Sequence, residues 1–209
     1  MTAILVAVII MFSLLIGNAV NKTFSYIWTS LVYWGVFCIP LSVYFLGGRK
    51  GVKSIYKKPS LPMRTPKKSL FIMFAHMPCL GTLFAVFIPK ITVISIQVLG
   101  IALLYALING TIEELFWRGV FLNTFPDNSL KGYILPALFF SLWHIALYVL
   151  KDMNYQGGFA ALVGGAAFMG ILWGFIAYKT KSIRVVTIAH IITNFFAFSG
   201  MIYDNWFAR

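Results

Sequence analysis

The sequence is poor in charged side chains, and acidic ones are the rarest. Only five Asp and Glu residues occur among 209 residues, against 17 Lys and Arg. Charged residues make up 11% of the chain and apolar residues 60%, whereas a soluble domain has roughly 25% charged and roughly 45–50% apolar residues. This shortage of charge excludes an ordinary soluble domain and indicates that lipid surrounds much of the chain.

Other features are also missing. Strict alternation of polar and apolar residues is absent, which argues against a transmembrane β-barrel. The first apolar stretch lacks a basic segment before it and a small-residue cleavage pattern after it, so we expect a retained helix rather than a signal peptide. The two cysteines, Cys38 and Cys79, both lie inside apolar runs and are expected to be buried free thiols.

Seven apolar segments are long enough to cross a bilayer, which takes about 20 helical residues. We place them at 2–21, 25–47, 69–89, 91–117, 132–150, 157–178 and 184–205. The sequence therefore predicts an all-α fold, a polytopic transmembrane bundle of about seven helices. We expect residues 1–209 to form one integral membrane domain, with N-terminal helices and a basic cytoplasmic loop in 1–90 and a catalytic core in 91–205.

The basic residues are distributed unevenly between the two sides of this bundle. Eight lie in the connector between the second and third segments, namely Arg49, Lys50, Lys53, Lys57, Lys58, Arg64, Lys67 and Lys68. The positive-inside rule places this connector in the cytoplasm, which puts the amino terminus inside and the carboxyl terminus outside a cell membrane. We expect loop 49–68 to touch anionic lipid, with docking of an acidic partner as the alternative. Nucleic acid is not an expected partner.

Ionisable residues inside membrane-spanning segments are costly, so each one is a functional hypothesis. Glu114 and Arg118 are four residues apart, share one helix face and can form an ion pair. Glu113 is rotated from Glu114 by about 100°. It therefore has a different, desolvated environment that suits a general base. The alternative is a charge cluster at a helix end near the cytoplasmic interface.

Two further helices carry polar pairs with helical spacing. Phe140 and His144 are four residues apart in FFSLWH, and His190 and Asn194 are four apart in AHIITN. At a rise of about 1.5 Å per residue, these side chains and Glu113 lie at compatible depths. We therefore expect helices four, five and seven to bring one carboxylate, two imidazoles and a carboxamide into a single cavity.

The three motifs occur in order as EExxxR at 113–118, FxxxH at 140–144 and HxxxN at 190–194. This set resembles the CPBP family of CAAX prenyl proteases and bacteriocin-processing enzymes, also called the Abi family. The resemblance covers residues 91–205 and implies a four-helix catalytic core like that of type II CAAX proteases. Residues 1–90 carry no diagnostic motif.

The resemblance implies a hydrolase, an intramembrane protease of the glutamate type. Glu113 and His144 would activate the attacking water, and His190 and Asn194 would stabilise the oxyanion. Glu114, Arg118 and Phe140 would support the geometry of the site. Amide hydrolysis needs a base for water and fixed donors for the developing negative oxygen, and these residue types suit both tasks.

Several alternatives remain open from the sequence. No metal or other cofactor is expected, although Glu113, His144 and His190 could form a zinc site with a bound water. The chain could instead be a non-enzymatic immunity or regulatory partner that uses the same bundle for binding. A transporter with a proton relay is less favoured, because paired interrupted helices are absent. The expected substrate is a peptide or membrane protein that arrives from the cytoplasmic side or laterally from lipid.

Overall fold

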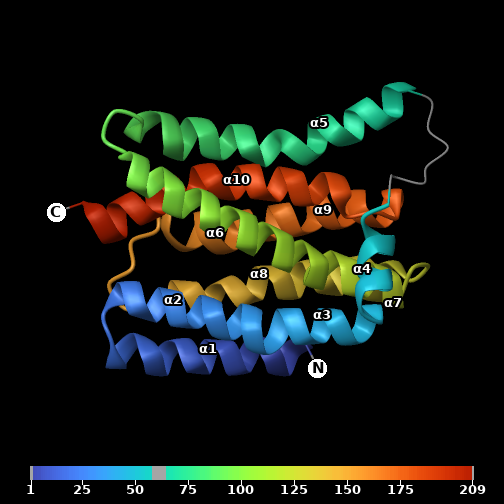
Figure 1. The fold of residues 1–209 in the computed structure, drawn as a ribbon, viewed down its shortest axis with the longest axis horizontal. Helices are drawn as coiled ribbons and strands as arrows, with labels where there is room; N and C mark the ends of the chain where they lie inside the picture. Colours follow the sequence, from blue (N-terminus) through green and yellow to red (C-terminus); the bar gives the residue numbers. More distant parts are fainter. Residues whose placement is uncertain (1, 58–64, 209) are drawn as a thin grey trace.

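The computed structural model describes residues 2–57 and 65–208, and within these ranges the regular secondary structure is entirely helical. Seven helices in the described ranges are long and apolar enough to span a membrane: Thr2–Ala19, Lys22–Leu46, Ser69–Lys90, Ile96–Thr124, Leu130–Tyr148, Ala160–Thr180 and Arg184–Phe207. The predicted all-α, multi-pass membrane bundle is therefore confirmed. The two chain ends lie toward opposite ends of the bundle (Figure 1).

Most spans are built from an α-helix joined to a short π-helical segment. The first is α1 (Thr2–Ala19), and the second combines α2 (Lys22–Val32), η1 (Tyr33–Cys38) and α3 (Ile39–Leu46). After the short α4 (Arg49–Ile55), the third contains α5 (Thr65–Thr82), η2 (Leu83–Phe87) and η3 (Ile88–Lys90). The fourth joins α6 (Ile96–Glu114), η4 (Leu115–Val120) and α7 (Phe121–Thr124). The last three contain η5 (Leu130–Ile134) with α8 (Leu135–Tyr148), η6 (Ala160–Gly164) with α9 (Gly165–Thr180), and α10 (Arg184–Ile202) with η7 (Tyr203–Phe207).

Local sequence signals set several of the helix ends. The Asn21 side chain accepts a hydrogen bond from the Phe24 amide and caps α2, and Ser95 caps α6 in the same way. Gly47 follows α3 with a φ of 69°, a conformation that glycine adopts without strain, and it closes that helix. Asn21, Gly47 and Ser95 therefore mark where these helices begin or end.

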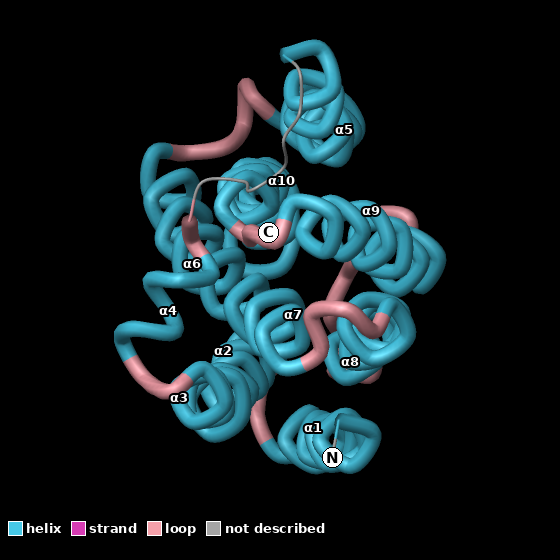
Figure 2. The backbone as a smooth tube through the Cα atoms, turned by 90° about the vertical axis from the view of Figure 1, so that its right-hand side faces the viewer, coloured by secondary structure: helices cyan, strands magenta, loops and turns pink. Residues whose placement is uncertain are grey.

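Helix α10 organises the bundle, because it packs against both α6 and α5. On the other side of the molecule, α8 packs against α9 and α1, and α5 stands at the periphery (Figure 2). Glycine permits the closest approach: a Cβ at Gly110 of α6 would lie 2.9 Å from Ile191 Cγ1 of α10. A Cβ at Gly170 of α9 would lie 2.9 Å from the Ala137 carbonyl oxygen of α8. Small residues at such crossings let backbones approach closely.

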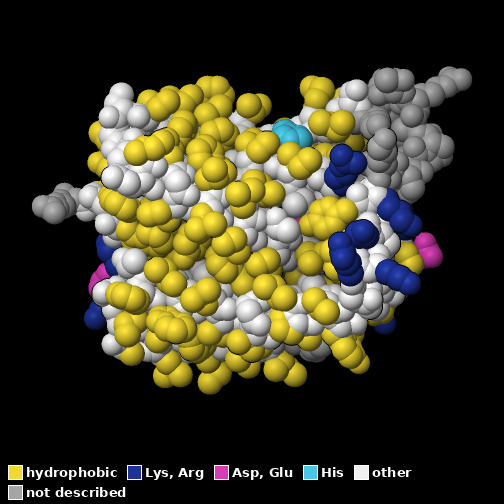
Figure 3. Space-filling view, viewed as in Figure 1, with side chains coloured by type: hydrophobic (Ala, Val, Ile, Leu, Met, Phe, Trp, Pro, Cys, Tyr) yellow, Lys and Arg dark blue, Asp and Glu magenta, His cyan; other side chains and the backbone are white. Residues whose placement is uncertain are grey.

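The surface has the pattern expected of a protein embedded in lipid. Hydrophobic side chains cover the middle of the face in Figure 3, and Lys and Arg side chains gather at the end where α4 and α7 lie. We call this the basic end. In an 18-residue stretch of the span Ser69–Lys90, which contains most of α5, only 11% of the residues are buried, against 50% in such a stretch of Arg184–Phe207. Lipid therefore covers most of the third span.

The fourth span differs from its predicted limits. We expected it to end at residue 117, but the helix continues through η4 and α7 to Thr124. Glu113 and Glu114 are fully buried and Arg118 is 3% exposed. The alternative of a charge cluster at an interfacial helix end is therefore wrong. Because Glu114 neutralises Arg118, the helix can continue with both charges inside the protein.

The basic connector is described only in part. In the predicted lipid-contacting loop 49–68, residues 58–64 lie outside the described residues. Helix α4 is described, and Arg49, Lys50 and Lys53 are exposed on it. Contact with anionic lipid and the division of the chain near residue 90 both remain predictions.

Candidate active site

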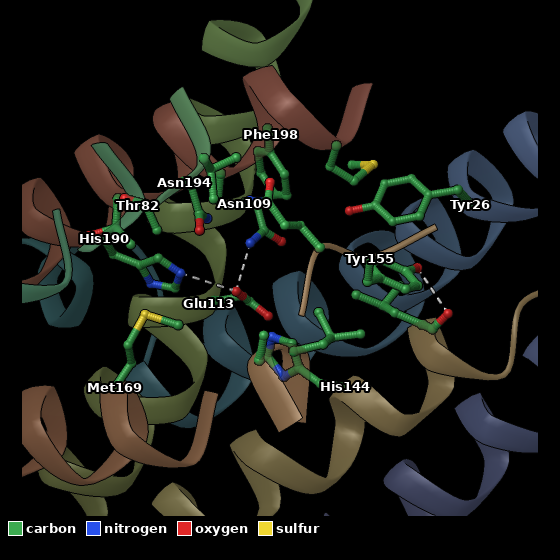
Figure 4. Close-up of a pocket in the computed structure, with 18 of the residues that line it drawn as sticks. Tyr26, Thr82, Asn109, Glu113, His144, Tyr155, Met169, His190, Asn194 and Phe198 are labelled. Carbon is green, nitrogen blue, oxygen red and sulfur yellow. Dashed lines mark hydrogen bonds and ion pairs between the residues drawn. The ribbon is translucent and has the colours of Figure 1, made fainter. Parts of the chain in front are cut away.

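The four polar residues predicted to converge do line one cavity, of about 220 Å³. Glu113 comes from α6, His144 from α8, and His190 and Asn194 from α10. Figure 4 shows these side chains directed toward a shared space between the three helices. The convergence follows from the close contact of α6 with α10 at Gly110, one turn before Glu113.

Glu113 is buried, and polar groups hold both of its oxygens. The Tyr33 hydroxyl donates a hydrogen bond to Oε1 over 3.0 Å, and Asn109 Nδ2 donates to Oε2 over 2.7 Å. His190 Nε2 lies 3.5 Å from the same Oε2. We expected a desolvated carboxylate, and the structure adds donors that fix the plane of its carboxyl group.

Two indole groups orient those donors in turn. Trp117 Nε1 donates to the Tyr33 hydroxyl oxygen over 2.5 Å, and Trp34 Nε1 donates to Asn109 Oδ1 over 2.9 Å. None of these four supporting residues was predicted from the sequence. Asn109 could have been found, because it lies one helical turn before Glu113. Tyr33 and Trp34 could not, because they belong to η1, 75 or more positions away along the chain.

Glu114 faces a separate polar cluster. Its Oε1 lies 3.0 Å from Arg118 Nη1 and 2.8 Å from His190 Nδ1. The predicted Glu114–Arg118 proximity is present, and the contact with His190 is new. Arg118 also places its Cζ atom 4.1 Å from the centre of the Phe140 ring, a cation–π arrangement. His190 therefore lies between the two adjacent glutamates.

His144 has one ring nitrogen engaged and one directed elsewhere. Its Nδ1 lies 2.8 Å from the carbonyl oxygen of Phe140. Because a carbonyl oxygen can only accept, Nδ1 must carry the hydrogen of this bond. In the neutral ring, Nε2 is then left with a lone pair. The FxxxH spacing thus fixes the tautomer through the backbone of residue 140.

Asn194 supplies an unused donor. Its side chain is 8% exposed, and its Nδ2 atom is buried without a hydrogen-bond acceptor among the described residues. It lies one turn beyond His190 on α10 and lines the same cavity. A buried amide that lacks an acceptor is costly in a protein interior, so this group is available to a ligand.

The cavity runs from this site toward one end of the bundle only. Along α10 and η7 its lining residues extend from His190 to Asp204, and on the third span they are Thr82 and Val86. On the other side of Glu113, Phe116 and Trp117 are fully buried. The cavity therefore extends away from the basic end, and access from the cytoplasmic side remains a prediction. Lateral access from lipid remains a prediction.

The structure also bears on metal ligands. Within residues 2–57 and 65–208, no three His, Cys, Asp or Glu side chains are arranged to hold a metal ion. Glu113, His144 and His190 line the same cavity without forming such a group.

The fold and the cavity together define a polytopic membrane protein with a buried polar site. Residues 95–196 match the family model described as type II CAAX prenyl endopeptidase Rce1-like, and all three motifs lie inside this match. Over this region the chain is similar to the Rce1-like family, and the predicted resemblance to CAAX proteases is confirmed. The narrower assignments to the bacteriocin-processing and Abi members remain predictions. No curated protein and no solved structure matches the chain.

Proposed function

We propose that this protein is an intramembrane endopeptidase that hydrolyses a peptide bond of a membrane-associated peptide or protein. The observation that carries the proposal is the single cavity shared by Glu113, His144, His190 and Asn194. A carboxylate, an imidazole lone pair and an unpaired amide donor meet there, which are the groups that amide hydrolysis requires. The family match points to a protease as well.

In the proposed reaction, a water molecule binds between Glu113 and Nε2 of His144. The Glu113 carboxylate accepts one proton of the water while His144 accepts a hydrogen bond from the other. The water oxygen attacks the carbonyl carbon, and the carbonyl oxygen becomes a tetrahedral oxyanion. When the carbon–nitrogen bond breaks, Glu113 returns its proton to the leaving amine.

The oxyanion receives hydrogen bonds from Asn194 Nδ2 and from Nε2 of His190. Glu114 occupies Nδ1 of His190, so donation from Nε2 requires the doubly protonated ring. The Glu114–Arg118 pair thus acts through His190 by fixing its orientation. Phe140 contributes twice, with its carbonyl oxygen on His144 and its ring against Arg118.

The test is cleavage by Glu113→Gln and His144→Ala variants. Both should lose activity by about a thousandfold or more, because a base and its partner are removed, while membrane insertion and thermal unfolding stay near wild type. Asp127→Asn is the matched control, because that side chain is 96% exposed. Comparing the peptides released by cells that carry the wild type with those released by cells that carry the Glu113→Gln variant would identify substrates. Cleavage retained by Glu113→Gln would contradict the proposal.

We propose that the reaction proceeds without a metal ion. Activity should then persist in a strong chelator, and the purified protein should contain no stoichiometric zinc. Loss of activity in chelator with recovery on adding zinc would contradict this part. A cellular phenotype that survives substitution of all four cavity residues would instead support a non-enzymatic binding role.

A further inference from the structure

The cavity concentrates negative charge in a strongly basic protein. The net charge of the chain is +12, yet two of its five acidic residues, Glu113 and Asp204, line this one cavity. In the described part of the chain, no Lys or Arg lines it. Glu113 stands at the inner end, and Asp204 stands near the end opposite the basic connectors. Asp204 is therefore the anionic group near the cavity mouth with which a cationic side chain could pair.

Asp204 is held by one cation, which approaches from outside the cavity. It lies in η7 and forms an ion pair with Lys90 of η3, and each side chain is 20% exposed. Lys90 does not line the cavity, whereas Asp204 does. Gly200 lets the third span lie close to α10, because a Cβ there would clash with Val86 Cγ1. The Asp204 carboxylate thus lines the cavity, and the Lys90 ammonium group that pairs with it lies outside the cavity lining.

The separation of His190 and Asp204 along the seventh span sets a register. Asp204 follows His190 by fourteen positions through α10 and η7, which is about 21 Å at a helical rise of about 1.5 Å per residue. An extended peptide covers about 3.3–3.6 Å per residue. A chain lying along the cavity would therefore reach Asp204 about six residues from the carbonyl that reacts at Glu113.

We propose that Asp204 is a cation-binding subsite that selects a substrate with a Lys or Arg side chain about six residues from the scissile bond. Without substrate, Lys90 pairs with Asp204. When the substrate cation takes the place of Lys90, Asp204 is again paired with one positive charge. The register rests on the proposed peptidase function, whereas the charge preference is a binding property that does not require catalysis.

The first experiment measures binding to the full-length Glu113→Gln variant in lipid nanodiscs. The probes are fluorescent 14-residue peptides of Ala, Leu and Gln that differ at one position, which is Lys, Gln or Glu. The Lys peptide should bind about fivefold more tightly than the Gln peptide, the effect of one partly exposed charge pair. The further substitution Asp204→Asn should abolish this preference, and Lys90→Met should increase it.

Asp152→Asn is the matched control for the same end of the molecule. Asp152 is exposed in the connector before η6, has a φ of 61° that Asn also tolerates, and does not line the cavity. The preference should survive this change. Equal affinities for the three peptides, or a preference that survives Asp204→Asn, would overturn the proposal. If Asp204→Asn fails to fold, Lys90→Met and Asp204→Glu replace it in the test. The proposal is then overturned if both variants prefer the Lys peptide over the Gln peptide to the same extent as the unsubstituted protein.

The register is tested with the active protein. Moving the Lys residue from three to nine positions from the cleaved bond should give a maximum of kcat/KM near six, and a flat profile would overturn the assigned register. Absence of cleavage in every peptide, together with an intact Lys preference in binding, would count against the peptidase proposal and leave the subsite supported.

Discussion

The two adjacent carboxylates of α6 lie in different surroundings on two sides of the helix. Glu114 lies in a buried cluster with Arg118 and does not line the cavity described above. Glu113, one residue earlier, accepts hydrogen bonds from Tyr33 and Asn109 and lines the cavity. Both are fully buried, so burial alone does not distinguish them. The difference shows how a helical rotation of about 100° can separate a structural counter-ion from a group available for chemistry.

The largest expected effect is on stability and comes from removing the buried ion pair of Glu114 with Arg118. Arg118→Met removes the cation beside Glu114 and leaves a buried carboxylate with only His190 as a partner. Removing one member of a buried pair typically costs about 3–5 kcal/mol, so the unfolding midpoint in detergent should fall sharply. Arg49→Met, at an exposed position of α4, should change it little.

A double variant sharpens this test. Glu114→Gln combined with Arg118→Met removes both charges and should recover part of the lost stability. Equal stability of the wild type and the Arg118→Met single variant would show that the pair does not hold this region together.

A smaller effect is expected on the cavity side. Tyr33→Phe removes the hydroxyl that donates to Glu113 and accepts from Trp117. The carboxylate loses one orienting bond, so kcat should fall about tenfold, equivalent to about 1.4 kcal/mol, with KM nearly unchanged. Tyr44→Phe is the control, because that residue is 76% exposed. A parallel change in KM and kcat would indicate a general disturbance of the cavity instead.

The smallest effect on kcat is expected at Trp34, which contacts Glu113 only through Asn109. Trp34→Phe removes the donor to Asn109 Oδ1 and leaves the Asn109–Glu113 bond in place. We expect kcat to decrease about twofold to threefold, since a single neutral hydrogen bond contributes about 1 kcal/mol and acts here only through Asn109. Trp28→Phe, on the same span and 50% exposed, provides the comparison. A loss larger than that of Tyr33→Phe would reverse the assumed order of importance.

The sequence predicted the features that depend on local pattern. Hydrophobic length indicated the seven spans, and four-residue spacing correctly grouped Glu114 with Arg118 and His190 with Asn194 on shared faces. These properties follow from helix geometry, which acts along the chain. The predicted end of the fourth span at residue 117 was wrong, because the burial of Arg118 depends on partners from other helices, such as Phe140.

Features that depend on packing between helices could not be read from spacing. The contact of His190 with both glutamates requires α10 to pack closely against α6, and no sequence motif predicts where two helices pack together. The direction of the cavity is also a property of the assembled bundle, since bulky residues such as Phe116 and Trp117 seal one end. Asp204 shows the same limit, because its place at the mouth depends on how η7 meets Lys90.

The hydroxyl group of Tyr33 comes from a stretch outside the region that matches the family model. A chimaera that grafted residues 95–196 onto foreign amino-terminal helices would carry Glu113 along but leave its donor behind. Substitutions at positions 33 and 34 should therefore lower activity although both positions lie outside the matched region. A segment that keeps these contacts to Glu113 and Asn109 must therefore include the second span as well as the region that bears the motifs.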